Sequence, residues 1–171
     1  MRLKSKIVVV YILAISIIII WITAIFLAPY LRNRAWPGYI FIYSLFSPIC
    51  HQNPARSFFI FGYPLAVCSR CLGIYIGFLG GVIIYPLFRG FSSLSLPRTK
   101  YFLALSLPIG VDTLGNFFRL WSTSNWPRFV LGFVWGIILP FYFITGLAEL
   151  ITAETTSKVK KYFLKSRYKS P

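Results

Sequence analysis

Residues 7–28 read IVVVYILAISIIIIWITAIFLA, an apolar run of 22 residues that contains no charged side chain. Ser16 and Thr23 alone interrupt its apolar character. An α-helix of this length crosses the apolar core of a bilayer, which is roughly 30 Å thick. Three basic residues precede the run, as in a signal peptide, but the stretch is too long for one and no small-residue cleavage site follows it. The stretch therefore predicts a retained membrane anchor.

The composition extends this prediction to the rest of the chain. Hydrophobic residues make up 57% of the sequence and charged residues only 12%, whereas a soluble domain carries about a quarter charged residues. One small core cannot hide that much apolar surface, so lipid is the expected solvent. The formal net charge of +15 would suggest nucleic acid in a soluble protein, but no nucleic-acid-binding motif is present. We expect a bilayer with anionic headgroups, and not nucleic acid, as the partner of the basic residues.

Further apolar segments predict an all-α, polytopic membrane protein that forms a single membrane domain over residues 1–171. The segment 38–49, which follows a break at 29–37, is too short to cross and predicts an interfacial or re-entrant helix. The basic segment 152–171 is expected to be a cytoplasmic tail. The four predicted transmembrane helices are 7–28, 65–88, 101–118 and 129–150.

Two local patterns add detail to these helices. Small residues let neighbouring helices approach closely, and the second span carries four glycines, namely Gly73, Gly77, Gly80 and Gly81. Before the last span, Ser124 and Asn125 precede Pro127, a residue that is favoured in the first turn of a helix. We therefore expect the last helix to begin at these two polar residues.

The distribution of basic residues predicts the orientation. Four spans place both termini on one side, where all eight lysines and four arginines would lie. The positive-inside rule then puts the termini in the cytoplasm of a protein of the cell (inner) membrane. The other side would carry six arginines and no lysine. Because the arginine fork suits carboxylate and phosphate, this set predicts specific pairing, although headgroup anchoring explains Arg32 and Arg34 equally well.

All three cysteines and the single histidine fall within 22 residues, as Cys50-His51 followed by Cys68-x2-Cys71. Three thiols and one imidazole suffice for a closed tetrahedral metal site if the loop folds back over the start of the second span. Zinc fits these donors best and needs no redox chemistry. Because adjacent residues rarely both ligate one ion, His51 is either the fourth ligand or a residue that orients a thiolate. A disulfide or thiol-redox pair, and inert packing of buried thiols, remain alternatives.

Asp112 is a lone acid in the middle of the third predicted span, where an ionised carboxylate is costly unless it is paired. Asn116 lies on the same helix face, and Arg119 lies close to it. The candidate charge partners are Arg56, Arg70 and Arg128. These residues predict either a buried Asp–Arg pair that fixes helix packing or a polar, anion-binding pocket for a headgroup or small ligand.

Two stretches of the chain resemble a known family. They are Cys50-His51-Gln52-x-Pro54-x-Arg56-Ser57-Phe58 and Cys68-x-Arg70-Cys71-x-Gly73-Ile74-Tyr75-x-Gly77. They are similar to a family of small prokaryotic membrane proteins known as domain of unknown function 2085, as is the later stretch 108–136. The family usually has Asp-Gly with a following Gln, whereas here Thr113 follows Asp112 and Asn116 supplies the amide. The resemblance implies a membrane location and no particular activity.

These observations favour a multi-pass membrane protein that holds a metal, expected to be zinc, at its outer face beside an Asp/Arg-lined pocket. Two other classes of function stay open. An enzyme would use the metal, or thiol exchange, on a lipid-linked substrate, and would need an open coordination position or a reactive thiol. An accessory subunit of a larger membrane complex would present glycine-rich and aromatic helix faces to other subunits, and its cluster would be purely structural.

Overall fold

The computed structural model describes residues 2–89 and 99–167, with side chains described over 8–87, at 100 and over 102–147. As predicted, the described chain is mostly helical. In chain order its elements are α1 Arg2–Asn33, α2 Gly38–Phe46, the 3-10 turn η1 Pro54–Arg56, β1 Phe59–Ile60, β2 Tyr63–Pro64, α3 Ser69–Arg89, α4 Thr99–Phe117 and α5 Asn125–Arg167.

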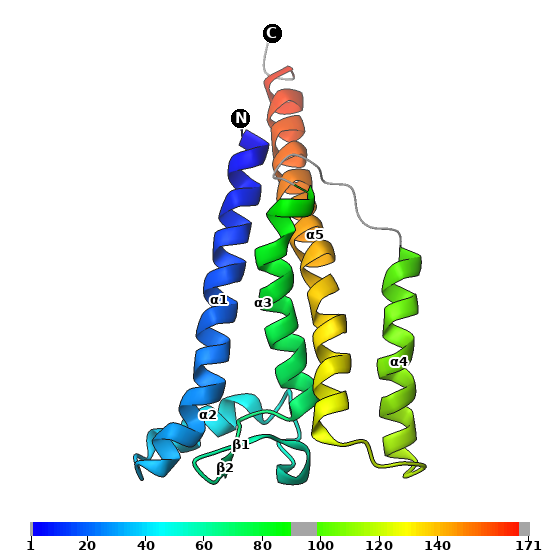
Figure 1. Ribbon diagram of the computed structural model, residues 1–171. Coiled ribbons are helices and arrows are strands. Elements are labelled where there is room, and N and C mark those ends of the chain that lie inside the picture. The colour runs from blue at the N-terminus through cyan, green and yellow to red at the C-terminus, as the bar shows by residue number, and fades with distance from the viewer. Residues whose placement is uncertain (1, 90–98, 168–171) are drawn as a thin grey trace.

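Among the described residues, three helical segments are long and apolar enough to cross a membrane: Val8–Asn33, Ser69–Leu87 and Asn125–Leu147. In α4 the shorter segment Phe102–Phe117 is apolar. The long helices run side by side, and α1 begins at the same end of the bundle at which α5 ends (Figure 1). The crossing of a fourth helix and the interfacial position of α2 stay predictions.

The helices differ in extent from the predicted segments at three places. α1 continues through Pro29 to Asn33, because the fully buried Pro29 packs in the bundle, where a proline within a helix is tolerated. α3 begins at Ser69 rather than at residue 65, since the apolar residues before it form a buried segment of the loop. Residues 152–167 of the expected tail continue α5 as helix. The connector residues 90–98 and the last four residues lie outside the described chain.

The helices α3 and α5 pack backbone against backbone. At five glycines of this interface, an added Cβ would lie 2.2–2.3 Å from a carbonyl oxygen of the opposite helix. The five are Gly73, Gly77 and Gly81 in α3, and Gly132 and Gly136 in α5. Spacing of small residues by four allows this close approach. The prediction holds for three of the four glycines singled out in α3, whereas a Cβ at Gly80 would meet nothing within 4 Å.

A compact apolar cluster joins the end of α1, α2 and the loop before α3. Ile25 of α1, Phe46 of α2 and Val67 of the loop are fully buried in it. The Trp21 ring meets the edge of Phe46 with ring centroids 4.8 Å apart. This cluster supports the loop that carries the cysteines and fixes where that loop meets the start of α3.

Candidate functional site

The loop between α2 and α3 is held in its folded-back path by Gln52. The Gln52 amide donates hydrogen bonds to the carbonyl of Tyr43 in α2 (2.7 Å) and to that of Ala66 before α3 (2.8 Å). Gln52 itself has a φ of 47°, a left-handed conformation that costs a residue with a Cβ about 1 kcal/mol or more. One side chain thus ties the two ends of the loop together.

A small hairpin completes the loop. Strands β1 and β2 are antiparallel, and the turn between them places Phe61 and Gly62 at φ values of 53° and 79°. Two successive positive φ values match the two-residue turn that joins twisted strands, where glycine is favoured. The Leu65 amide then donates to the Phe58 carbonyl (2.8 Å), which closes the hairpin and directs the chain toward α3.

The fold-back brings the three thiols together. The sulfurs of Cys50, Cys68 and Cys71 all lie within 4.8 Å of one another. Cys68 is the residue just before α3, and its carbonyl accepts the first helical hydrogen bond, from Leu72 (3.0 Å). The Cys68 backbone N–H donates to the Cys50 sulfur (3.2 Å). The cluster therefore sits at the positive N-terminal end of a helix, which favours thiolates.

The thiols also act on one another. Hydrogen bonds with Cys50 and then with Cys71 lower the pKa of the Cys68 thiol, whereas the hydrogen bond with Cys68 raises the pKa of the Cys50 thiol. All three cysteines are free, with Cys50 buried and the other two half-buried. The cluster therefore combines one sulfur that favours the thiolate with neighbours that stabilise it.

The donor set fits a tetrahedral metal ion. Zinc–sulfur bonds of about 2.3 Å in tetrahedral geometry place two sulfurs about 3.8 Å apart. From within 4.8 Å, modest side-chain rotations reach this separation. Among the described residues, the group of mutually close ligand atoms consists of these three sulfurs, while His51 is exposed on the wall of the same cavity. Ligation by His51 stays a prediction.

A network of hydrogen bonds surrounds Asp112. Arg70 of α3 forms an ion pair with Asp112 of α4, so it is Arg70 among the three candidate arginines that pairs with this acid. The Asn116 amide donates to the Asp112 side chain (3.0 Å) and to the Thr123 hydroxyl (3.0 Å). Arg128 of α5 donates to the Asn116 oxygen (2.6 Å). The network links the last turns of α4 to α3 and α5.

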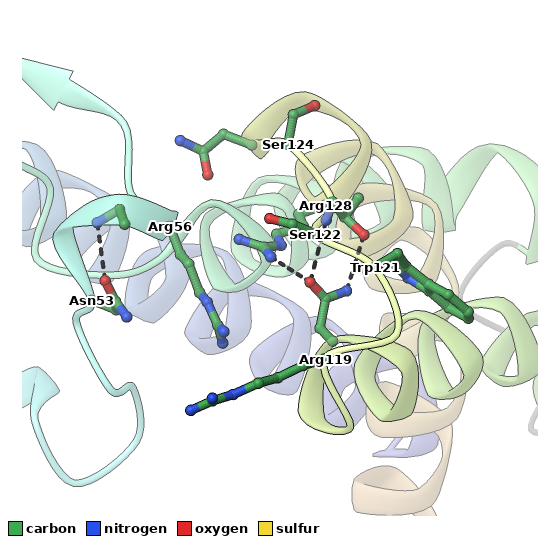
Figure 2. A pocket seen from close by; sticks show the side chains of 11 residues that line it. Asn53, Arg56, Arg119, Trp121, Ser122, Ser124 and Arg128 are labelled. Carbon is green, nitrogen blue, oxygen red and sulfur yellow. Dashed lines mark hydrogen bonds between the residues drawn. The ribbon is translucent and has the colours of Figure 1, made fainter.

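Two adjoining cavities open at this end of the bundle. One, of about 540 Å³, is lined by the three cysteines, His51 and Arg70 among others. The second, of about 730 Å³, is lined by Asn53, by Ala55 and by residues 121–125 among others. Asn53, Arg56, Asn116, Arg119 and Arg128 line both. In Figure 2 the side chains of Arg56 and Arg119 approach one another from the two walls of the second cavity.

Two arginines of these cavities lie in energetically unfavourable positions. Arg128 is only 5% exposed, and its described partner is the neutral amide of Asn116 rather than a carboxylate. A buried charge without a charged partner costs several kcal/mol. Arg119 has a φ of 58°, a left-handed conformation that is uncommon for a residue with a Cβ. It lies just past the end of α4 and not on the helix face of Asp112. Strain of this kind gathers at functional sites.

The structure brings the sequence-predicted residues to one end of the bundle in two neighbouring groups. The thiols form one, and Asp112, Asn116, Arg70 and Arg128 form the other. Sequence reasoning did not single out Gln52 or Thr123 as organising residues. Gln52 lies between Cys50 and Pro54 in the recognised motif, and the amide side chain of this motif residue was the signal available. For Thr123 the local sequence offered only turn chemistry.

Comparisons with known proteins give a consistent picture. A family model described as "Predicted membrane protein (DUF2085)" matches residues 50–142. An uncharacterized protein of Methanocaldococcus jannaschii is 37% identical over 147 residues, which cover 82% of this chain and 94% of that protein. An uncharacterized protein of Methanothermobacter thermautotrophicus is 33% identical over 94 residues, which cover 54% of this chain and 81% of that protein. No solved structure matches.

Proposed function

Because the chain belongs to the DUF2085 family of predicted membrane proteins, we propose that it is a multi-pass membrane protein with a zinc site beside an anion-binding pocket. Cys50, Cys68 and Cys71 are the thiolate ligands of this proposal, and His51 is the fourth ligand or orients a thiolate. Asp112, Asn116 and the nearby arginines line the pocket.

The observation that carries the metal half is the mutual approach of the three sulfurs to within 4.8 Å. Residues 18 to 21 positions apart in a loop meet in this way because Gln52 and the apolar cluster hold the fold-back. Three thiolates packed together repel one another, and a divalent cation removes that repulsion. The Cys68 pKa shift is in the direction that metal binding needs, since only the thiolate ligates.

A zinc ion at this place would supply positive charge to the cavity wall and, with a coordination position left open, a Lewis-acid centre. The protein holds the ligands and the neighbouring charge in place. Cys50 is fixed by the Cys68 backbone, and Arg70 stands one residue from Cys71 with its charge balanced by Asp112. The topology of the proposal has α4 as a fourth crossing, both termini in the cytoplasm and the site at the outer face of the cell membrane.

Elemental analysis of the purified full-length protein tests the metal half. We expect about one zinc per chain, lost in Cys50→Ser and in Cys68→Ser. Thr113→Ala is the matched control, because Thr113 lines the same cavity and its hydroxyl bonds only to its own helix, at the Ile109 carbonyl (2.6 Å). His51→Ala separates the two roles of His51: a ligand loses zinc when removed, whereas an orienting residue only weakens its retention against a chelator.

Thiol redox chemistry is the rival reading of the same cluster. The closeness of Cys68 and Cys71, three residues apart at a helix start, would serve a disulfide exchange as well as a metal. A preparation without metal in which Cys68 and Cys71 form a disulfide would replace the zinc proposal with this one. A metal retained without any pocket ligand would favour the accessory-subunit role, in which the cluster is structural.

A further inference from the structure

The larger cavity is lined by arginines and by no carboxylate. Of the three acids in the chain, Asp112 is engaged by Arg70. The other two, Glu149 and Glu154, lie on α5 more than 20 residues beyond Arg128, about 30 Å along the helix. Arg56, Arg119 and Arg128 therefore place three mutually repelling guanidinium groups around one cavity whose lining includes no carboxylate, and one of these side chains is 95% buried. An anion of matching charge offsets this repulsion.

The neutral groups of the cavity are hydrogen-bond donors of the kind that phosphate oxygens accept. The hydroxyl residues Ser122 and Ser124 line it, and α5 begins at its wall with Asn125. The N-terminus of a helix directs backbone N–H groups and positive dipole charge toward an anion. The buried Arg128 lies in the first turn of this helix, so the helix end and the guanidinium act on the same space.

Exposed apolar and aromatic side chains directly neighbour, in the sequence, the residues that line the cavity, and we call these neighbours its rim. Phe117, Phe118 and Leu120, which flank Arg119, are 77%, 66% and 71% exposed, and Trp126 in the first turn of α5 is 68% exposed. Large exposed apolar side chains beside an arginine pocket suit an amphiphile, with its headgroup in the pocket and its chains along the rim. Tryptophan is enriched at this level of membrane proteins.

We propose that this cavity binds a terminal phosphate group, a phosphomonoester or the end of a diphosphate, between Arg56, Arg119, Arg128 and the start of α5. A terminal phosphate presents three oxygens and nearly two charges, which match three guanidinium groups. A phosphodiester or a carboxylate offers two such oxygens and one charge. The inference rests on the pocket of the proposed function and not on its metal.

The test measures dissociation constants by isothermal titration calorimetry, with full-length protein in a neutral detergent at mildly alkaline pH. The three probes are dioctanoyl phosphatidic acid, dioctanoyl phosphatidylglycerol and inorganic phosphate. We expect phosphatidic acid to bind about tenfold or more tightly than phosphatidylglycerol, since one added charge-assisted contact is worth about that factor. Inorganic phosphate as tight as phosphatidic acid supports a soluble source for the phosphate group, and much weaker inorganic phosphate supports a lipid.

Arg56→Gln and Arg119→Gln change exposed side chains, so these variants are expected to fold. Each should weaken phosphatidic acid binding about tenfold. Arg34→Gln is the matched control: it removes one charge from an exposed arginine beyond the end of α1, outside both cavities. Its binding should equal that of the unchanged protein.

Equal affinity for the two lipids, an Arg34→Gln loss as large as that of Arg119→Gln, or no binding of any probe would overturn the inference. Zinc content measured on the same preparations keeps it separate from the metal half of the proposed function. Zinc retained without phosphate binding overturns the phosphate site alone. Phosphate binding without zinc overturns the metal site alone.

Discussion

The helix α5 is held on one side by α3 and on another by α4, and the two interfaces are built in opposite ways. Toward α3 it presents glycines along most of the contact, so that backbones touch, and a polar contact between Ser69 and Asn125 (3.3 Å) lies at the end. Toward α4 it presents Trp135, whose ring N–H donates to Ser106 (2.9 Å), and Arg128, which donates to Asn116. Figure 1 shows α3 close against α5 and α4 standing apart from both.

The difference shows which part of the bundle is rigid. Close backbone packing permits only one arrangement of α3 and α5, because any shift drives carbonyls into Cα atoms. The contacts of α4 are polar side chains and rings, which re-form after small movements. The thiols at the start of α3 thus stand on the rigid pair, whereas Asp112 and Asn116 of α4, and Arg119 just past its end, form the adjustable wall of the cavities.

The largest expected effect comes from filling the rigid interface. In Gly77→Ala the new Cβ would lie 2.2 Å from the Phe133 carbonyl oxygen, so α3 and α5 must separate. We expect a loss of about 3 kcal/mol in the free energy of unfolding, the upper range of overpacking, measured as a lowered thermal midpoint in detergent.

Gly80→Ala is the control for this prediction. It lies three residues further along the same helix with nothing within 4 Å of the added Cβ. Removing a helix glycine there should raise the stability by up to about 1 kcal/mol. Equal midpoints for the two variants would show that the helices do not touch at Gly77.

A smaller effect is expected from the polar interface. Asp112→Asn removes the charge that pairs with Arg70 and leaves that guanidinium, whose side chain is 20% exposed, without its partner. Losses range from about 1 kcal/mol at a surface to about 3–5 kcal/mol for a buried pair, so we expect about 2 kcal/mol. Hydrogen exchange should become faster in α4 while α3 and α5 stay protected.

Thr113→Ala, on the next residue, keeps the pair and should leave exchange in α4 unchanged. Faster exchange in all three helices of the Asp112→Asn variant would mean that α4 is an integral part of the rigid unit. The comparison between the two interfaces would then fail.

The sequence predicts the rigid part of this picture better than the adjustable part. Hydropathy and glycine spacing are local properties, so the membrane-spanning character and the glycines of α3 are visible without coordinates. The approach of Cys50 to the CxxC pair can also be predicted from the sequence, because few residues separate them and prolines restrict the conformations of the loop. The choice of Arg70 as partner of Asp112 depends on the rotation of α3 about its axis, which residue spacing leaves open.

Helix boundaries are difficult to predict from the sequence where apolar residues are buried outside a helix. Residues 65–67 are apolar like the helix that follows, but they form a buried end of the loop, where the Gln52 amide binds the Ala66 carbonyl. The role of Gln52 follows from two backbone carbonyls that only the tertiary fold brings together. Proline is a poor stop signal here for a related reason, since packing around Pro29 holds α1 in helical form.

Gln52→Ala tests how far the thiol loop depends on its own fastening rather than on α3. The Ala66 carbonyl loses the Gln52 donor, while the Tyr43 carbonyl keeps the Ser47 amide (3.1 Å), so the variant should lose about 1–2 kcal/mol of stability. In chelator-treated protein, Cys50, now 5% exposed, should react faster with an alkylating reagent. Asn53→Ala removes the cap of η1, a 3.0 Å bond to the Ala55 amide, from an exposed side chain in the cavity wall; because both Gln52 bonds remain, the Cys50 rate should be unchanged. An unaltered rate in Gln52→Ala would place the loop under the control of the apolar cluster alone.

The smallest effect is expected where α4 and α5 meet away from the site. Trp135→Phe keeps a ring beside Phe102 and deletes the hydrogen bond to the Ser106 hydroxyl, which in turn donates to its own helix at the Phe102 carbonyl (2.8 Å). Because Ser106 keeps that second partner, the loss should be only about 0.5–1 kcal/mol. Hydrogen exchange would locate it: faster exchange confined to the half of α4 near Ser106, with the Asp112 half unchanged, fits an interface of separable polar contacts. Exchange that rises along the whole helix would show that α4 is fastened as one unit, and that its wall of the cavities cannot move without the rest.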